Sequence, residues 1–162
     1  MEPLPAVAPA PLTTVELAEF LSRLPDLDVD GVPDAERIDQ LGLLESIKAA
    51  AAGAQARVSV AFADSQREQR AARGVPARER GRGLGAQVAL ARRESPHRGS
   101  RHLGLALALV GELPHTFAHL RAGRVSEWRA TIVCRETACL TREDRGRVDV
   151  LLAEVLPTLG DR

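Results

Sequence analysis

The chain has 162 residues and a formal net charge of zero, which suits one globular domain of ordinary size. Hydrophobic residues make up 44% of it and charged residues 27%, which excludes a wholly disordered protein. The hydrophobic residues are chiefly Ala, Leu and Val, with three Phe, one Trp and no Tyr. Because Ala and Leu favour helices whereas strands favour aromatic residues, the composition predicts an all-α fold.

Residues 1–32 are predicted to be a tail with one short helix. The Pro/Ala-rich start of this tail is expected to be disordered. Thr13 or Thr14 would cap a helix that runs to about Leu24, and Glu16 is placed for a capping box with Thr13. The first residues lack the basic start of a signal peptide, and no apolar run in the chain is long enough to span a membrane. We therefore expect a cytoplasmic protein.

Residues 33–160 are predicted to form the helical domain, which opens with one long helix. Pro33 and Asp34 make a good start, because Pro suits the first helical position and acids suit the first turn. No further Pro occurs before about Ala72. Apolar or small residues recur at helical, nearly heptad spacing at Ile38, Leu41, Leu44, Ile47, Ala51, Ala54, Val58, Ala61 and Ser65. This face of residues 34–72 would pack either on its own domain or on a second copy in a homodimer.

Shorter helices are predicted after the long one, in two pairs that each have the size of a helix-turn-helix motif. Pro and Gly separate them, and Ser126 and Thr141 are suitable N-caps, with Asp144 in the capping role after Thr141. No segment alternates convincingly between apolar and polar residues as a strand would. The helices are expected over residues 84–93, 97–111, 115–122, 127–138 and 142–156.

Charge is unevenly distributed along the chain. Residues 1–66 hold 11 acidic and 4 basic residues, whereas residues 67–102 hold 3 acidic residues and 10 arginines. A nucleic-acid-binding protein needs cations for phosphates beside a helix presented by a tight turn. We therefore predict nucleic-acid binding, with DNA as the partner, through Arg78, Arg80, Arg82, Arg92, Arg93, Arg98 and Arg101. The alternative is that these arginines face solvent or pair with the acidic N-terminal part.

Other conspicuous residues favour structural roles. Mixed charges on the helix over 127–138 favour packing with surface ion pairs, and Trp128 is expected in the core, with a stacking platform as the alternative. Glu112, His115 and His119 form an ExxHxxxH pattern, but Pro114 separates the glutamate from the histidines. No nucleophile or phosphate-binding motif is present. We therefore expect no catalytic residue, no metal site and no cofactor.

The two cysteines, Cys134 and Cys139, are five residues apart. On a helix this spacing turns the two side chains about 140° apart, which disfavours a disulfide between them. A single CxxxxC pair is also not a zinc signature. Both are expected to be reduced, core-type thiols.

Several stretches resemble a known bacterial family. They are VALARRESP at 88–96, LALALVGELPHTFAHLRAGRVS at 105–126 and RATIVCRETACLTRED at 129–144, preceded by the long helix ERIDQLGLLESIKAAAAGAQARVSVAF. Through them, about residues 33–156 resemble domain-of-unknown-function family 222. Members of that family are commonly described as HNH endonucleases or as repeat-family proteins, because many carry a C-terminal HNH module. The resemblance implies the N-terminal helical region of an HNH-endonuclease-like protein.

The chemistry of an HNH module does not transfer to this chain. Such a module uses a general-base His, an orienting Asn and a metal ion held by His or Asp. The chain has no Asn, its last His is His119, and no strand pair is predicted after residue 149. We therefore predict a non-catalytic domain for nucleic-acid binding or targeting, of which a truncated remnant is one form. The alternative is a structural or self-association module that dimerises through the long helix.

Overall fold

The computed structural model describes residues 10–159, and every regular element in that range is helical. Seven α-helices and three short 3-10 helices follow one another within the described residues, which confirms the predicted all-α fold. The chain divides into two units, residues 1–39 and residues 40–162, with the division inside the long helix. The expected disorder of the Pro/Ala-rich start falls largely on residues 1–9, outside the described residues.

The first unit contains helix α1, Thr14–Arg23, followed by a 3-10 turn over Leu24–Asp26. The predicted capping box is confirmed. The Thr13 hydroxyl accepts a hydrogen bond from the Glu16 backbone N–H at 3.2 Å, and the Glu16 carboxylate accepts one from the Thr13 N–H at 2.7 Å. These bonds from the backbone and side chain of Thr13 hold the pKa of Glu16 below its usual value.

The long helix α2 spans Asp34–Ala72, as predicted. Its buried residues are all small: Ala49, Ala52, Gly53, Ala56 and Ala63. The predicted face was a different one, and none of its nine residues is buried. At about 100° per residue, the part of that face from Ile47 to Ser65 lies on the opposite side of the helix from the buried alanines. The prediction that this face of α2 packs on its own domain is therefore wrong.

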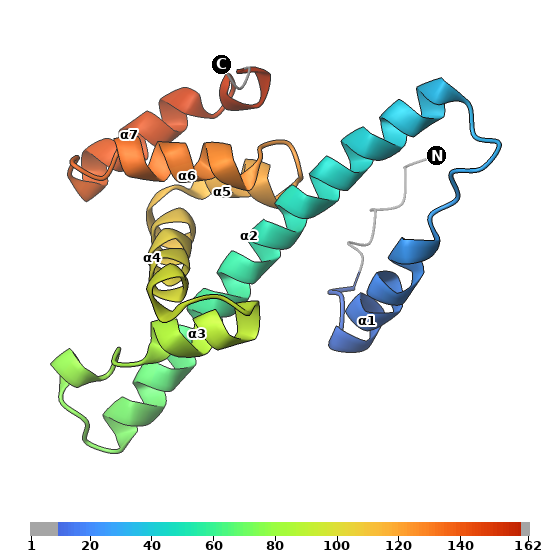
Figure 1. Cartoon of the computed structure of the whole chain (residues 1–162). Helices are drawn as coiled ribbons and strands as arrows, with labels where there is room; N and C mark the ends of the chain where they lie inside the picture. The colour runs from blue at the N-terminus through green and yellow to red at the C-terminus, as the bar shows by residue number, and fades with distance from the viewer. Residues whose placement is uncertain (1–9, 160–162) are drawn as a thin grey trace, which may run out of the picture. The chain divides into compact units, whose positions relative to one another are not determined.

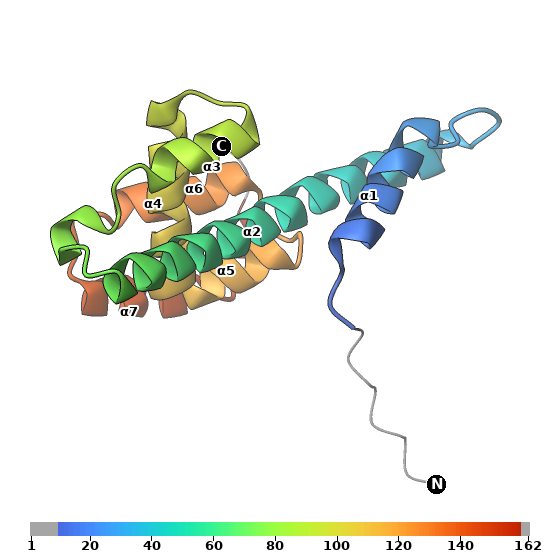
Figure 2. The same ribbon diagram turned by 90° about the horizontal axis from the view of Figure 1, so that it is seen from below.

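Five further helices complete the second unit (Figures 1 and 2): α3 Leu84–Arg92, α4 Pro96–Glu112, α5 Pro114–Arg121, α6 Glu127–Glu136 and α7 Arg142–Leu152. Helix α4 runs from α3 at one end to α5 and α6 at the other (Figure 1). Helix α7 is shorter than predicted, because the chain turns at Ala153 and then forms a 3-10 helix over Leu156–Thr158. Another 3-10 helix, Ala77–Glu79, lies in the loop between α2 and α3.

The core of the second unit is built from leucines set against alanines. Leu109 of α4, Leu113 between α4 and α5, and Leu120 of α5 are almost fully buried against the small residues of α2. Small residues let the backbones approach closely: a Cβ added at Gly53 would lie 3.1 Å from the backbone of Arg121 in α5. The small and aliphatic residues of the sequence therefore allow α2 to pack tightly on its own domain.

Helices α3 and α4 pack closely and set the position of the basic residues at the start of α4. Gly99 of α4 lies against the backbone of Gly85 in α3. The chain leaves α3 through Arg93, which has a left-handed φ of 56°, and the Ser95 hydroxyl then caps α4 by accepting from the Arg98 N–H at 3.4 Å. These features place the first turns of α4 at the surface.

Candidate nucleic-acid interface

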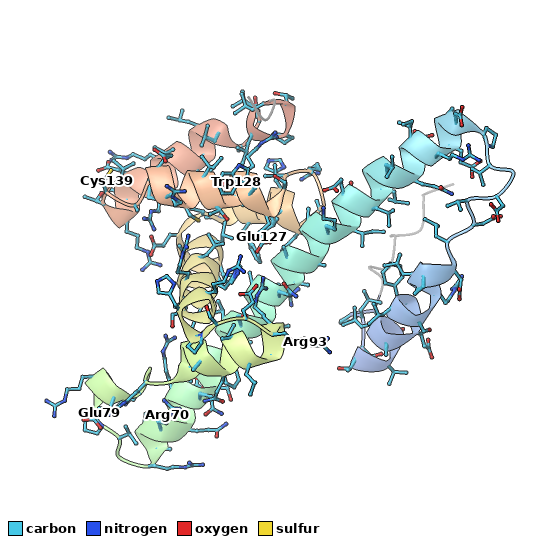
Figure 3. All side chains as sticks on the ribbon, in the orientation of Figure 1. Arg70, Glu79, Arg93, Glu127, Trp128 and Cys139 are labelled. Carbon is cyan, nitrogen blue, oxygen red and sulfur yellow. The ribbon has the colours of Figure 1, made fainter. Side chains whose placement is uncertain are left out.

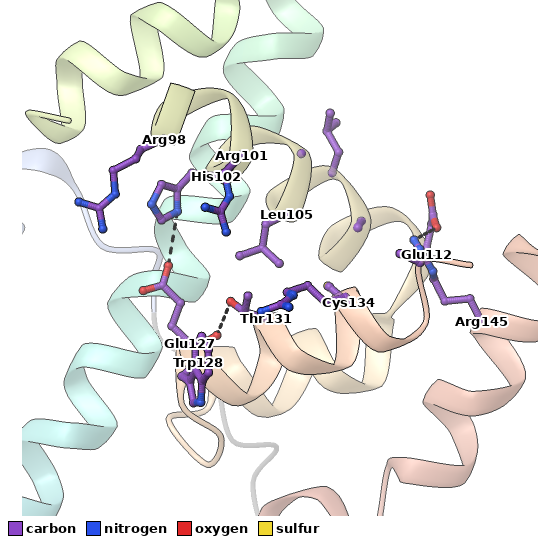
Figure 4. Close-up of a pocket in the computed structure, with 15 residues that line it drawn as sticks. Arg98, Arg101, His102, Leu105, Glu112, Glu127, Trp128, Thr131, Cys134 and Arg145 are labelled. Carbon is purple, nitrogen blue, oxygen red and sulfur yellow. Dashed lines mark hydrogen bonds and ion pairs between the residues drawn. The ribbon is translucent and has the colours of Figure 1, made fainter. Parts of the chain in front are cut away.

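A groove of about 720 Å³ lies between α4 and α6 (Figure 4). Its less exposed lining residues, which form the floor, include Leu105 and Ala108 from α4 and Thr131 and Cys134 from α6. Its volume falls in the range of about 300–1,000 Å³ that is typical of pockets for organic ligands. The groove therefore has both the size and the apolar floor of a binding site.

Three arginines line the exposed parts of this groove. Arg98 and Arg101 come from the first turns of α4, and Arg135 comes from the last turn of α6. All three side chains are exposed, and within residues 10–159 none of their guanidinium groups has a hydrogen-bond or ion-pair partner. Arginine is the side chain best suited to planar, two-pronged contacts with phosphate or carboxylate. The groove thus offers free cations on both of its walls.

The acidic residues of the groove are already paired within the protein. Glu127 lies 3.8 Å from the Arg92 guanidinium and 3.8 Å from the His102 ring. Glu112, at the other end of the groove, forms an ion pair with Arg145, which is itself nearly buried (Figure 4). The free charge that remains in the groove is positive, so its electrostatics favour an anionic ligand.

Trp128 lies at the surface rather than in the core, where it was expected. Its side chain is 60% exposed and lines the groove. Helix α6 buries Ala130, Val133 and Cys134 instead. Trp128 precedes Ala130 by two residues, about 200° around the helix, so burying that face turns the indole outward. The alternative of a stacking platform stays open.

Sequence reasoning missed Arg135 and expected Trp128 in the core, with the stacking platform only as the alternative. The two are seven residues apart, which is close to two helical turns and puts them on the same side of α6. This spacing was the available signal, and the mixed charges of the helix obscured it.

The arginines predicted to bind nucleic acid do not form one surface. Arg80 donates from Nε to the Val75 carbonyl at 2.8 Å. Arg92 bonds to Gln55 and lies near Glu94 and Glu127, so it is occupied inside the domain. The loop that holds Arg80 is itself tied down by Arg70, which donates to the carbonyls of residues 80 and 82 at 2.8 and 2.7 Å.

The remaining predicted arginines are separated along the domain. Arg78 is exposed and lies 3.5 Å from the carboxylate of Glu79. Arg82 precedes α3 and Arg93 ends it, so the two lie at opposite ends of that helix; Figure 3 shows Arg93 far from Glu79. Of the predicted set, Arg98 and Arg101 alone line the groove.

The three residues of the ExxHxxxH pattern contact different partners and do not converge on one site. Glu112 pairs with Arg145, and the His119 ring contacts the Ala153 carbonyl and accepts from Arg124 Nε at 3.1 Å. His115 is held through its backbone N–H, which donates to Asp149. Among residues 10–159, no group of three or more His, Cys, Asp and Glu side chains could hold a metal ion. That the chain has no catalytic residue, metal or cofactor stays a prediction.

Both cysteines are free thiols, but their surroundings differ. Cys134 is buried in the groove floor, and burial raises the pKa of its thiol to about 11, although the charge of Arg145 acts in the opposite direction. Cys134 therefore stays protonated and unreactive near neutral pH. Cys139 is exposed, so the expectation of a core position is wrong for it.

No family model, curated protein or solved structure matches the chain. The resemblance to family 222 and the relation to HNH endonucleases therefore stay predictions. In the part of the chain that the structure describes, no single helix is long and apolar enough to cross a bilayer. Helices α4 and α5 reach that length only as a pair, bent by 111° at their break.

Proposed function

We propose that the second unit is a non-catalytic domain that binds nucleic acid through the α4–α6 groove. The observation that carries the proposal is the set of three exposed arginines, Arg98, Arg101 and Arg135, on the two walls of one groove, whose guanidinium groups have no partner among residues 10–159. Unpaired cations are available to phosphates without first breaking an internal ion pair.

The surroundings of these arginines support a polyanionic ligand. Of the nearby carboxylates, Glu112 is paired with Arg145, and Glu127 lies 3.8 Å from Arg92, which offsets part of its repulsion of a phosphate chain. Two of the arginines stand in the first turns of α4, where the helix dipole adds a partial positive charge. The predicted resemblance to family 222 adds that the domain would serve to bind or target nucleic acid in the cytoplasm and would not itself cut it.

The test is the salt-dependent binding of labelled oligonucleotides, both single strand and duplex, followed by fluorescence anisotropy. The full chain should bind at about 50 mM salt and weaken steeply towards about 200 mM, because binding releases counterions from the phosphates. Replacing all three groove arginines with Ala should lower affinity by roughly 10- to 100-fold and reduce the salt slope by about 2–3.

The control is a triple variant with the same change of charge, Arg23→Ala, Arg57→Ala and Arg73→Ala, in which all three residues are exposed and none lines the groove. It should retain affinity within about threefold, since it removes only long-range attraction. Circular dichroism should show both triple variants folded. The proposal fails if the wild type binds neither oligonucleotide, or if the control loses as much affinity as the groove variant.

A second candidate is self-association through the face of α2 that the sequence predicted for packing, because this face is exposed in the structure. Val58 is 68% exposed, and Ala51, Ala54 and Ala61 lie near it on the same side of α2, also exposed. Repeated small and apolar residues at nearly heptad spacing are typical of paired helices.

Sedimentation velocity tests this candidate. If α2 pairs with a second copy, the wild type should sediment as a dimer, and Ala54→Glu with Val58→Glu should return it to a monomer, because the variant places facing carboxylates at the contact. Arg57→Glu, beside this face, is the control and should leave the dimer in place. A wild type that stays monomeric at high concentration would exclude the candidate.

A further inference from the structure

The exposed side of α4 lies within a hollow, and this shape limits the ligand. Arg98, Arg101, His102, Leu105 and Ala108 of α4 all line the groove, with α6 as its other wall (Figure 4). A recognition helix about 10–12 Å across fills a major groove about 12 Å wide, so it must protrude from its domain. Here α6 flanks the face of α4 that would have to enter. A duplex read by insertion of α4 does not suit this geometry.

The groove combines the two features that a single strand requires. Proteins that bind single strands track the backbone with cations and stack the bases on aromatic side chains. The arginines stand on the walls of the groove, and Trp128, which is 60% exposed, lines its edge at the start of α6. The Glu127 carboxylate next to Trp128 is held towards Arg92 and His102, so it is partly neutralised where a phosphate would approach.

We infer that the α4–α6 groove holds a single strand of nucleic acid, with a base stacked on Trp128 and phosphates bound by Arg98, Arg101 and Arg135. This inference rests on the proposed function and adds the class of nucleic acid. The apolar floor around Leu105 and Ala108 receives the faces of further bases, which contact it without sequence-specific hydrogen bonds. Binding is therefore tolerant of sequence.

Intrinsic fluorescence gives a direct test, because Trp128 is the only Trp in the chain and there is no Tyr. Titration of the full chain with an oligothymidylate of about 12 nucleotides, within the site sizes of single-strand binders, should quench the emission to saturation. The quenching should weaken as salt rises. A duplex of equal length should quench little, because its bases are already stacked.

Two variants separate stacking from charge. Trp128→Ala should lower affinity for the single strand by about 5- to 100-fold in anisotropy, as loss of one stacked base does, and affinity for the duplex by less than about twofold. Trp128→Phe should keep most of the affinity, since it retains an aromatic face. Because the side chain is exposed, neither change should alter the thermal midpoint appreciably.

Each contrary outcome has a distinct meaning. If Trp128→Ala binds the single strand as well as the wild type does, or if duplex binds and quenches equally, the single-strand inference is overturned while the proposed function stands. If poly-glutamate displaces the oligonucleotide at equal charge concentration, the groove binds acidic peptides and the inference fails. If no oligonucleotide binds at all, the proposed function fails as well.

Discussion

Replacing Asp149 with Ala is expected to lower the free energy of unfolding by about 3–5 kcal/mol, because it leaves buried donors at the start of α5 without a partner. The Asp149 carboxylate, on α7, is fully buried. It accepts from the backbone N–H groups of His115 and Thr116 at 2.7 and 2.9 Å, and from the Thr116 hydroxyl at 2.6 Å. The residue thus acts as an N-cap supplied from a distant helix. Urea denaturation monitored by circular dichroism gives the measurement.

The matched control is Asp144→Ala, five residues earlier in the same helix. The Asp144 carboxylate accepts from the hydroxyl of Thr141, the N-cap of α7, and pairs with Arg147, and these contacts are exposed. Replacing Asp144 should lower the free energy of unfolding by only about 0.5–1 kcal/mol. Asp149→Asn keeps one acceptor oxygen and should fall between the two. A cost for Asp149→Ala no larger than that of the control would contradict the role assigned to this carboxylate.

Replacing Gly99 with Ala is expected to destabilise the protein by about 2–4 kcal/mol, because the added methyl group has no space. A Cβ at this position would overlap the carbonyl oxygen of Gly85 and the Cβ of Ala89, and would lie 2.6 Å from the Ala89 backbone nitrogen. These neighbours belong to a packed helix, so α3 and α4 must move apart. The thermal midpoint should fall accordingly, and Gly99→Val should destabilise more.

Gly104→Ala, five residues later in α4, isolates the effect of packing from that of helix propensity. Nothing lies within 4 Å of a Cβ added there. Ala is favoured over Gly inside a helix by up to about 1 kcal/mol, so this variant should be slightly more stable than the wild type. If Gly99→Ala were also neutral or stabilising, α3 and α4 would not pack as closely as described.

Local signals in the sequence predicted where helices begin. Thr13 with Glu16, Ser126 and Thr141 are all N-caps in the structure, because a cap depends on residues within three positions of each other. The face on which α2 packs was not predictable in the same way. Alanines occur on every side of that helix, so periodicity gave little contrast, and contacts such as Gly53 with Arg121 decide which side is buried.

The candidate site was only partly predictable for a related reason. Arg92 and Arg98 look alike in a charge count, yet Arg92 is occupied by Gln55 and Glu127, while Arg98 is free. Likewise, an aromatic residue is usually expected in a core, and only the packing of α6 through Ala130 and Val133 turns Trp128 outward. Such partners lie far away in the sequence and meet only in the folded chain.

By itself, the sequence determined that this protein is all-α, where its helices start and that its basic charge lies in the middle of the chain. These properties follow from composition and from interactions within one helical turn. The tertiary structure alone decided which arginines stay free, that Trp128 lies exposed at the edge of the α4–α6 groove and that Asp149 caps α5. The physical reason is that burial and pairing depend on contacts between residues more than 30 positions apart, such as Asp149 with Thr116.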